Sequence, residues 1–282
     1  MMKKPKGKRQ NRRSRPARPH RVKITPSLLR EAAGLFVDED AKTIVVVKKN
    51  VLLNQLKRDG PRIDKSFDAI CSSDLEEFSE LMAQTMVLIL SGLKRSRYSG
   101  DELRLMAGQL MLNTLNSFCA AVQILRSGYR LQPGVIVRNI LESVSVVLHL
   151  MQHPSDLEPF RAGKLNVPKT VNTAKKALPP FGQLYGFFTK QFSHISGFHQ
   201  SLQPLVEYSN RDEALISNLR FLRIAVWHIY VTSELLYHDM VTEPRYWTHI
   251  SSGIYAYDPS ADERQWLDRF LHGPDKQPFV PK

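Results

Sequence analysis

Cysteine is scarce in this sequence, whose 282 residues include only Cys71 and Cys119. Both lie in apolar segments with helical periodicity, and neither has the spacing of a metal site or of a disulfide framework. We expect both to be reduced thiols in the protein core. Such sparse use of cysteine is typical of a reducing compartment.

The short motifs that identify common enzymes are also missing. The sequence contains no G-x-S-x-G, P-loop, Rossmann glycine pattern or H-E-x-x-H, which disfavours classical hydrolases and nucleotide-dependent enzymes. Di-metal sites in helical bundles use Glu-x-x-His, but Ser145 stands three residues after Glu142 and Tyr237 three after Glu234. The sequence therefore predicts no metal and no cofactor.

Long apolar runs are absent as well. No segment has the roughly 18 uninterrupted apolar residues that suggest a membrane-spanning helix. The basic N-terminus lacks the apolar stretch of a secretory signal. Hydrophobic residues make up 42% of the chain, which is enough for a substantial core. We expect a soluble, cytoplasmic protein with no membrane partner.

Acidic residues are missing from the first 25 positions, which hold eleven cations: Lys3, Lys4, Lys6, Lys8, Arg9, Arg12, Arg13, Arg15, Arg18, Arg21 and Lys23. With three prolines and no apolar periodicity, residues 1–24 are predicted to be a disordered arm. Such a segment binds phosphates with a salt-sensitive affinity, because each contact releases counterions. We expect it to contact RNA or DNA, and a solubilising or targeting tail is the alternative.

The other residues are almost balanced in charge. Of 40 basic residues, 29 lie outside the arm, against 27 acidic residues in the whole chain. A body with a net charge of only +2 argues against a broad nucleic-acid-binding face on the fold itself.

Helical patterns dominate this body and predict an all-α fold, an antiparallel bundle of four or five long helices over residues 66–272. Capping boxes at 73–76 and 99–102 should open two helices that end at Gly92 and Gly128. Further helices are expected at 133–150 and 211–240, separated by a proline-rich insertion at 153–200. Residues 273–282 should form a flexible tail.

Residues 25–65 are predicted to form a helical or extended adaptor. Thr25 and Pro26 fit the N-cap and first turn of a short helix that ends near Gly34. The run TIVVV at 43–47 is either a short strand or the start of a helix. A strand there needs a partner, and the sequence offers no obvious one.

The helix at 133–150 is apolar nearly all round, which predicts burial, yet it carries Arg138, Glu142, Ser145 and His149 within a stripe roughly 60° wide. The helix at 211–240 has a similar stripe with Arg223, Tyr230, Glu234 and His238. Buried charges need partners. We expect Arg138 to pair with Glu142, and Arg223 with Glu234 or Glu142, with His149, Tyr230 and His238 as relays.

Two interpretations of these stripes remain open. A satisfied polar network that fixes helix register is one, and a ligand pocket or acid/base site is the other. His194 and His199, in the segment FSHISGFH of the insertion, are further candidate ligand-contacting residues.

The run LRSGYRLQPGVIVRNILESVSVVLHL, followed later by FSHISGFH, resembles uncharacterised bacterial helical proteins that are grouped with HEPN-like bundles. The resemblance covers roughly residues 70–240. It implies a helical bundle related to many antiphage and toxin ribonucleases, whose catalytic pattern is Arg, four to six residues, then His. Arg223 and His228 match that pattern. Residues five apart in a regular helix point about 140° away from each other, so a kink or a dimer partner would have to bring them together.

Three functional hypotheses follow. The leading one is a HEPN-like helical protein that acts on or beside nucleic acid, with the arm as an electrostatic tether. The second is a metal-independent endoribonuclease, in which Arg223 stabilises a pentavalent phosphate and His228 serves as acid and base. The third is a non-catalytic interaction module that dimerises or binds a protein partner through an apolar face.

Overall fold

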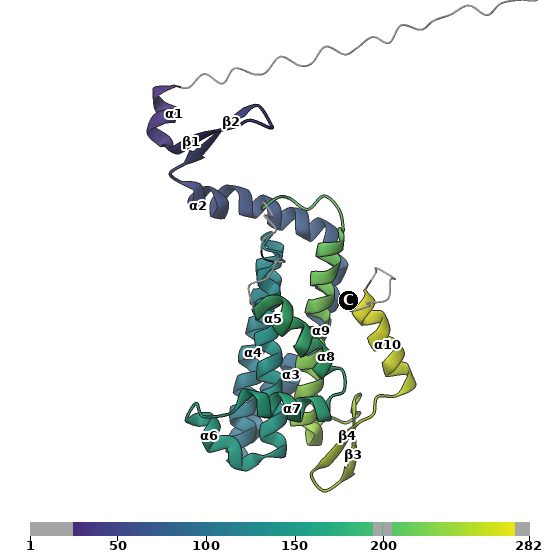
Figure 1. Ribbon diagram of the computed structural model, residues 1–282. Helices are drawn as coiled ribbons and strands as arrows, with labels where there is room; N and C mark the ends of the chain where they lie inside the picture. Colours follow the sequence, from purple (N-terminus) through teal and green to yellow (C-terminus); the bar gives the residue numbers. More distant parts are fainter. Residues whose placement is uncertain (1–24, 194–198, 200–204, 274–282) are drawn as a thin grey trace, which may run out of the picture. The chain divides into compact units, whose positions relative to one another are not determined.

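The computed structural model describes residues 25–193, 199 and 205–273 (Figure 1). Two compact units divide the chain between Asp59 and Gly60. We call residues 25–59 the N-terminal unit and residues 60–273 the bundle unit. The division lies six residues before the predicted one.

The N-terminal unit begins with helix α1 (Pro26–Glu31), and Thr25 caps it as predicted by accepting the N–H of Leu28. Strands β1 (Ala32–Asp38) and β2 (Thr43–Lys48) form an antiparallel hairpin. The strand alternative for residues 43–47 is therefore correct, and its partner is the segment directly before it. Helix α2 (Val51–Asn54) and the π-helical turn η1 (Gln55–Asp59) complete the unit.

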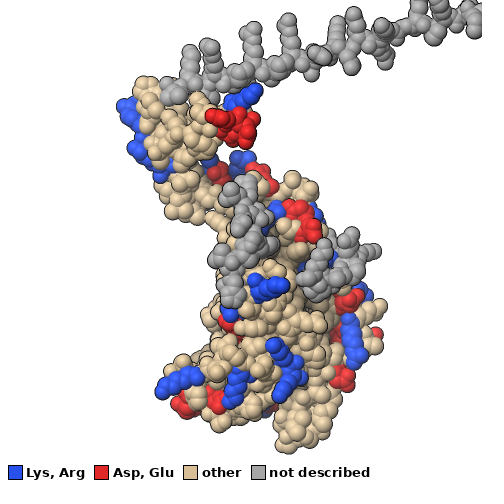
Figure 2. Space-filling view, in the orientation of Figure 1, with Lys and Arg blue, Asp and Glu red and all other residues tan. Residues whose placement is uncertain are grey.

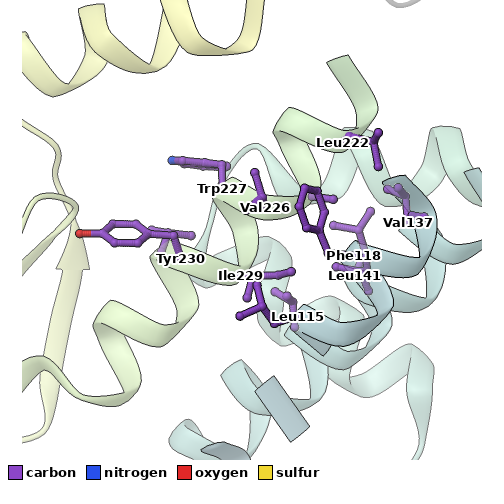
Figure 3. Packing of buried hydrophobic residues seen from close by; sticks show 14 of the residues in the cluster. Leu115, Phe118, Val137, Leu141, Leu222, Val226, Trp227, Ile229 and Tyr230 are labelled. Carbon is purple, nitrogen blue, oxygen red and sulfur yellow. The ribbon is translucent and has the colours of Figure 1, made fainter. Parts of the chain in front are cut away.

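Four long helices form the bundle unit: α3 (Gly60–Ser99), α4 (Glu102–Arg126), α5 (Gln132–Gln152) and α9 (Glu213–Leu236). Short loops join α3, α4 and α5 as antiparallel neighbours. Figure 3 shows side chains of α4, α5 and α9 meeting in the core, among them Leu115, Leu141 and Ile229. Trp227 and Tyr230 of α9 point away from this cluster, and Tyr246 packs against both.

Two predicted helix boundaries need correction. The capping box at 73–76 lies inside α3, which runs from Gly60 to Ser99 with irregular backbone only at Cys71. Gly92 does not end this helix. The backbone at residue 92 is helical, and only glycine fits there because the ring of Tyr237 lies where a Cβ would be. The second predicted start is right, although Asp101 is the N-cap and accepts the N–H of Arg104.

The proline-rich insertion folds into short helices, as predicted, and packs on α5. They are η2 (Pro154–Asp156), α6 (Leu157–Arg161), α7 (Val167–Ala177), α8 (Phe181–Phe188) and η3 (Thr189–Ser193). After α9 come η5 (His238–Met240), strands β3 (Trp247–Ser251) and β4 (Ile254–Tyr257), and helix α10 (Ala261–His272).

The fold is thus largely helical, with two small antiparallel hairpins in the described part of the chain, and is not purely all-α. The aromatic segment after α9 forms the second hairpin, which local pattern did not predict. Cys71 is buried as expected, but Cys119 is exposed, because α4 turns by about 100° per residue and presents the preceding Phe118 to the core.

One described helix, α5, is long and apolar enough to cross a membrane by length and composition. More than half of its apolar window is buried against the rest of the protein. The central helix of a bundle passes the same test, so α5 is weak evidence for a membrane span.

Candidate functional site

The polar stripe on α5 exists, and each of its four side chains has a hydrogen-bond or ion-pair partner, although Nε of Arg138 is buried without one among the described residues. Arg138 and Glu142 form the expected ion pair, with Nη2 and Oε1 2.8 Å apart, and the hydroxyl of Tyr185 on α8 donates to the same carboxylate. Ser145 Oγ lies 2.9 Å from Thr170 Oγ1 on α7. Helix α7 therefore covers the stripe with hydroxyl groups that sequence spacing did not single out.

His149 of this stripe is fully buried. Its Nδ1 lies 2.8 Å from Thr173 Oγ1 and its Nε2 lies 2.8 Å from Asp156 Oδ2. Asp156 also accepts a hydrogen bond from Lys169. The hydrogen bonds from Lys169 and then His149 lower the pKa of Asp156 to about 2. A series of hydroxyl, imidazole and carboxylate can transfer protons in an active site, but Thr173 is only 8% exposed. Here the series fastens η2 and α7 to α5.

Arg223 on α9 pairs with neither Glu142 nor Glu234, so the predicted link between the two stripes is wrong. Its guanidinium donates to Asp74 and Glu77 of α3 and to the carbonyl oxygen of Phe270 on α10. Only 1% of the Arg223 side chain is exposed. Asp74 and Glu77 are nearly 150 residues away in sequence, and helical spacing within α9 carries no information about them.

The other members of the α9 stripe hold the second hairpin. Glu234 is fully buried, and its Oε1 accepts the backbone N–H of Tyr246 at 2.7 Å. Burial raises the pKa of this carboxyl, and backbone N–H donors around it oppose the shift. Burial, followed by the charge of Glu234, raises the pKa of Tyr230 to about 12. His238 Nε2 lies 3.2 Å from the carbonyl oxygen of Trp247.

His228 is fully buried in the regular part of α9. Its Nδ1 donates to the carbonyl oxygen of Ile224 at 2.8 Å, because a carbonyl can only accept. Burial lowers the pKa of His228 to about 4, so the ring is neutral at pH 7. The structure does not bring Arg223 and His228 together. The first lies between α3 and α10, and the second packs edge-on against Phe181 of α8.

The remaining candidate residues are His194, His199 and the cations of the arm, and of these the structure describes only His199. His199 is partly buried. His194 lies outside the described residues, and so do all eleven cations of the arm between Lys3 and Lys23. The hypotheses about the arm and His194 therefore remain predictions.

A groove of about 1010 Å³ lies between α3 and α10. Charges of both signs line it, including Glu77, Glu80, Arg245 and Asp268. Arg245 is held by both carboxylate oxygens of Glu263 and lies 4.5 Å from the ring centre of Trp266. Because both acidic and basic side chains line the groove, it offers no selective surface to an anionic ligand.

A more uniform surface lies on the insertion. From Pro159 to Val206 the chain has six cations and no acidic residue, and the stretch before Glu31 has twelve cations and no acidic residue. These two stretches contain 18 of the 40 basic residues, which leaves 22 basic against 27 acidic residues elsewhere. The near-neutral net charge of the residues outside the arm thus combines a basic segment with an acidic remainder. This uneven distribution of charge was visible in the sequence.

Four lysines of this segment are exposed and form no ion pair with any described residue: Lys164, Lys175, Lys176 and Lys190. We call them the lysine face. The stem of Lys175 lies on Gly182 of α8, where a Cβ would come within 3.1 Å of its Cγ. Figure 2 shows blue side chains gathered over α7 with few red ones between them. This arrangement suits an extended polyanion.

The chain matches no protein-family model, no curated protein and no solved structure. The HEPN-like resemblance therefore remains a prediction that rests on the residues quoted above.

Proposed function

We propose that this protein is a HEPN-like helical-bundle protein that binds RNA or DNA through phosphate contacts. The basic arm acts as an electrostatic tether, and the lysine face adds contacts on the bundle unit. The observation that carries this proposal is the concentration of cations, without any acidic residue, in the two stretches that include the arm and the lysine face.

Charge distribution supports the proposal more strongly than net charge does. Lysines without carboxylate partners keep their full positive potential toward solvent, whereas paired cations such as Arg161, held by Glu102 and Glu158, contribute much less. Phosphate contacts of this kind give affinity without sequence selection. We therefore expect binding to single-stranded RNA and DNA of many sequences.

The positions of Arg223 and His228 do not favour catalysis by a metal-independent ribonuclease mechanism. Arg223 is held by carboxylates and His228 is neutral and enclosed, so neither side chain can reach a phosphodiester in the conformation described. The carboxylates beside Arg223, those of Asp74 and Glu77, are engaged in ion pairs with it. The proposal accordingly assigns binding and no bond cleavage.

The test is a salt titration of binding, measured by fluorescence anisotropy with a labelled single-stranded RNA and a DNA of the same sequence. Each phosphate neutralised on a single strand contributes roughly 0.7 to the slope of log K against log salt. Removal of residues 1–24 should cause the largest fall in slope. The Lys175→Gln, Lys176→Gln double variant should reduce the slope by roughly 1.4.

A matched control has the same loss of charge elsewhere on the bundle unit. Lys65 and Lys94 are exposed on α3, outside both acid-free stretches. Lys65→Gln with Lys94→Gln should leave the slope unchanged. If the two double variants behave alike, the lysine face is not part of the interface. If the intact chain shows no salt-dependent binding at all, the whole proposal is wrong.

A further inference from the structure

The N-terminal unit carries an unusual amount of exposed apolar surface. Eighteen large hydrophobic side chains are exposed in the described part of the chain, and ten of them lie within residues 29–56. They are Leu29, Leu35, Phe36, Val37, Ile44, Val47, Val51, Leu52, Leu53 and Leu56, with exposed fractions from 40% to 66%. We call them the apolar set. Clusters of this kind on a surface mark an interaction site.

No residue of this unit between Thr25 and Asp59 is buried. An isolated two-stranded hairpin is at best marginally stable in water, and chains below about 40 residues seldom bury enough surface to fold alone. In the hairpin, Phe36 stands opposite Val45 and Val37 opposite Ile44. Adjacent residues of a strand point to opposite faces, so both faces of the hairpin are apolar. The unit therefore needs a partner that covers more than one face.

The charges of the unit suit a neutral partner. Residues 25–59 contain six basic and five acidic residues. Asp38, Glu39 and Asp40 lie at the hairpin turn, and Lys48 is paired with Glu31 at 3.1 Å. No strand residue between Leu35 and Val37, or between Thr43 and Val47, is charged. The apolar strand residues therefore offer no charge complementary to a strongly acidic or basic partner.

We propose that a second copy of this chain is that partner, and that two N-terminal units associate through their apolar sets. A near-neutral surface that is apolar on both faces is complementary to itself, which is what a twofold interface requires. Ten half-exposed apolar side chains amount to roughly 800 Å², the area that one partner contributes to a stable interface of standard size. Each hairpin also has a free edge at which a strand of the second copy can pair.

Dimerisation through this unit has a consequence for the arm. The last cation of the arm, Lys23, precedes Thr25 by two residues. Two associated units therefore carry two arms from neighbouring points, and both arms can engage one polyanion with a high effective concentration. The dimer itself does not depend on nucleic acid binding.

The test is sedimentation velocity of the full chain after nuclease treatment, at roughly 0.5 M salt, where phosphate contacts are weak. Val37 and Val87 allow a matched comparison, because they are valines with 66% and 65% exposure, the first on β1 and the second on α3. For wild type and for Val87→Lys, the molar mass obtained from sedimentation should be that of a dimer. Phe36→Glu with Val37→Lys should sediment as a monomer, with the helical circular dichroism of the bundle unit retained.

Hydrogen exchange gives a second readout. Amides of β1 and β2 should become more protected as protein concentration rises from about 1 to 100 µM, because association is concentration-dependent. A wild type that remains monomeric over this range would overturn the proposal and leave the apolar set to a different partner. A Phe36→Glu, Val37→Lys variant that remains dimeric would overturn it equally, because the interface would then lie elsewhere. Neither result affects the salt dependence of nucleic acid binding. The dimer proposal and the nucleic-acid-binding proposal can therefore be refuted independently.

Discussion

Arg223 of α9 and Asp74 of α3 form a buried ion pair, with Nη2 2.6 Å from Oδ1. Arg211 donates to the other oxygen of the same carboxylate, also at 2.6 Å. The guanidinium of Arg223 additionally reaches the carbonyl oxygen of Phe270 and lies 5.1 Å from the centre of its ring. One side chain thus joins three helices that are distant in sequence, and its removal should affect the whole bundle unit.

Arg223→Ala should lower the free energy of unfolding by about 3 kcal/mol or more, because it leaves Asp74 buried with part of its compensation gone. Urea unfolding of the full chain measures this. Arg264→Ala is the control, since its pair with Asp258 is 64% exposed on both sides and should change stability by less than about 0.5 kcal/mol. Equal effects of the two substitutions would mean that water solvates the Arg223 cluster.

Acidification should destabilise the protein through His228. Its pKa falls from 6.5 in the unfolded chain to about 4 in the fold. Between pH 6.5 and 4 the unfolded state therefore binds a proton at His228 that the folded state does not bind. As the pH falls across this window, the free energy of unfolding decreases by roughly 3 kcal/mol. Asp156, with its pKa lowered to about 2, loses its contribution only below pH 3.8.

His228→Leu should remove most of this loss between pH 6.5 and 4, as measured by urea unfolding at a series of pH values. The raised pKa of Glu234 has the opposite sign, because the folded state binds that proton more tightly. Its effect is common to wild type and variant and cancels in the difference. His249→Leu, on an exposed strand position, should leave the pH dependence in place. A pH profile unaltered by His228→Leu would contradict the assignment.

Two helical glycines should respond in opposite directions to alanine. A Cβ at Gly92 would overlap the ring of Tyr237, whereas nothing lies within 4 Å of a Cβ at Gly186. Gly92→Ala should therefore cost about 1–3 kcal/mol from overpacking, despite the better helix propensity of alanine. Gly186→Ala, inside α8, should stabilise by roughly 0.5–1 kcal/mol. Thermal unfolding of both variants checks the contrast.

Incubation with the intact protein should leave labelled RNA uncleaved, because Arg223 and His228 are enclosed and point to different neighbours. Gel analysis over a long time course, with and without EDTA, is the measurement. Cleavage that resists EDTA and disappears in a folded His228→Leu variant would favour the ribonuclease hypothesis. This assay decides between RNA binding and RNA cleavage, and its outcome does not depend on whether the protein dimerises.

Local signals in the sequence predicted the features that depend on neighbouring residues. Thr25 before Pro26 placed the start of α1, and Pro133 stands in the first turn of α5 as expected. The spacing from Arg138 to His149 correctly gave a polar stripe on a buried helix, since the geometry of a helix fixes which residues share a face. The same reasoning placed a helix start at Ser73, whereas α3 continues through this position and is kinked two residues earlier, at Cys71.

The partners of those stripes could not be predicted in the same way. Nothing in the sequence around the partner residues indicates which side chain they contact. Asp74 pairs with Arg223, Thr170 with Ser145, and Thr173 with His149. Likewise, nothing near Trp247 predicts that Glu234 holds the strand next to it. Contacts of this kind follow from how helices pack, and packing is decided by the fit of many side chains at once.

The sequence by itself determined that this protein is largely helical, that two of its core helices carry polar stripes, and that its cations gather in stretches without acids. These properties follow from helical periodicity and composition, which need no knowledge of distant residues. Tertiary structure alone decided that Arg223 is a buried tie between α3, α9 and α10, and that four lysines of the insertion are exposed without an ion-pair partner among the described residues. It also decided that the N-terminal unit is left with its apolar side chains exposed, because burial depends on which elements meet in space.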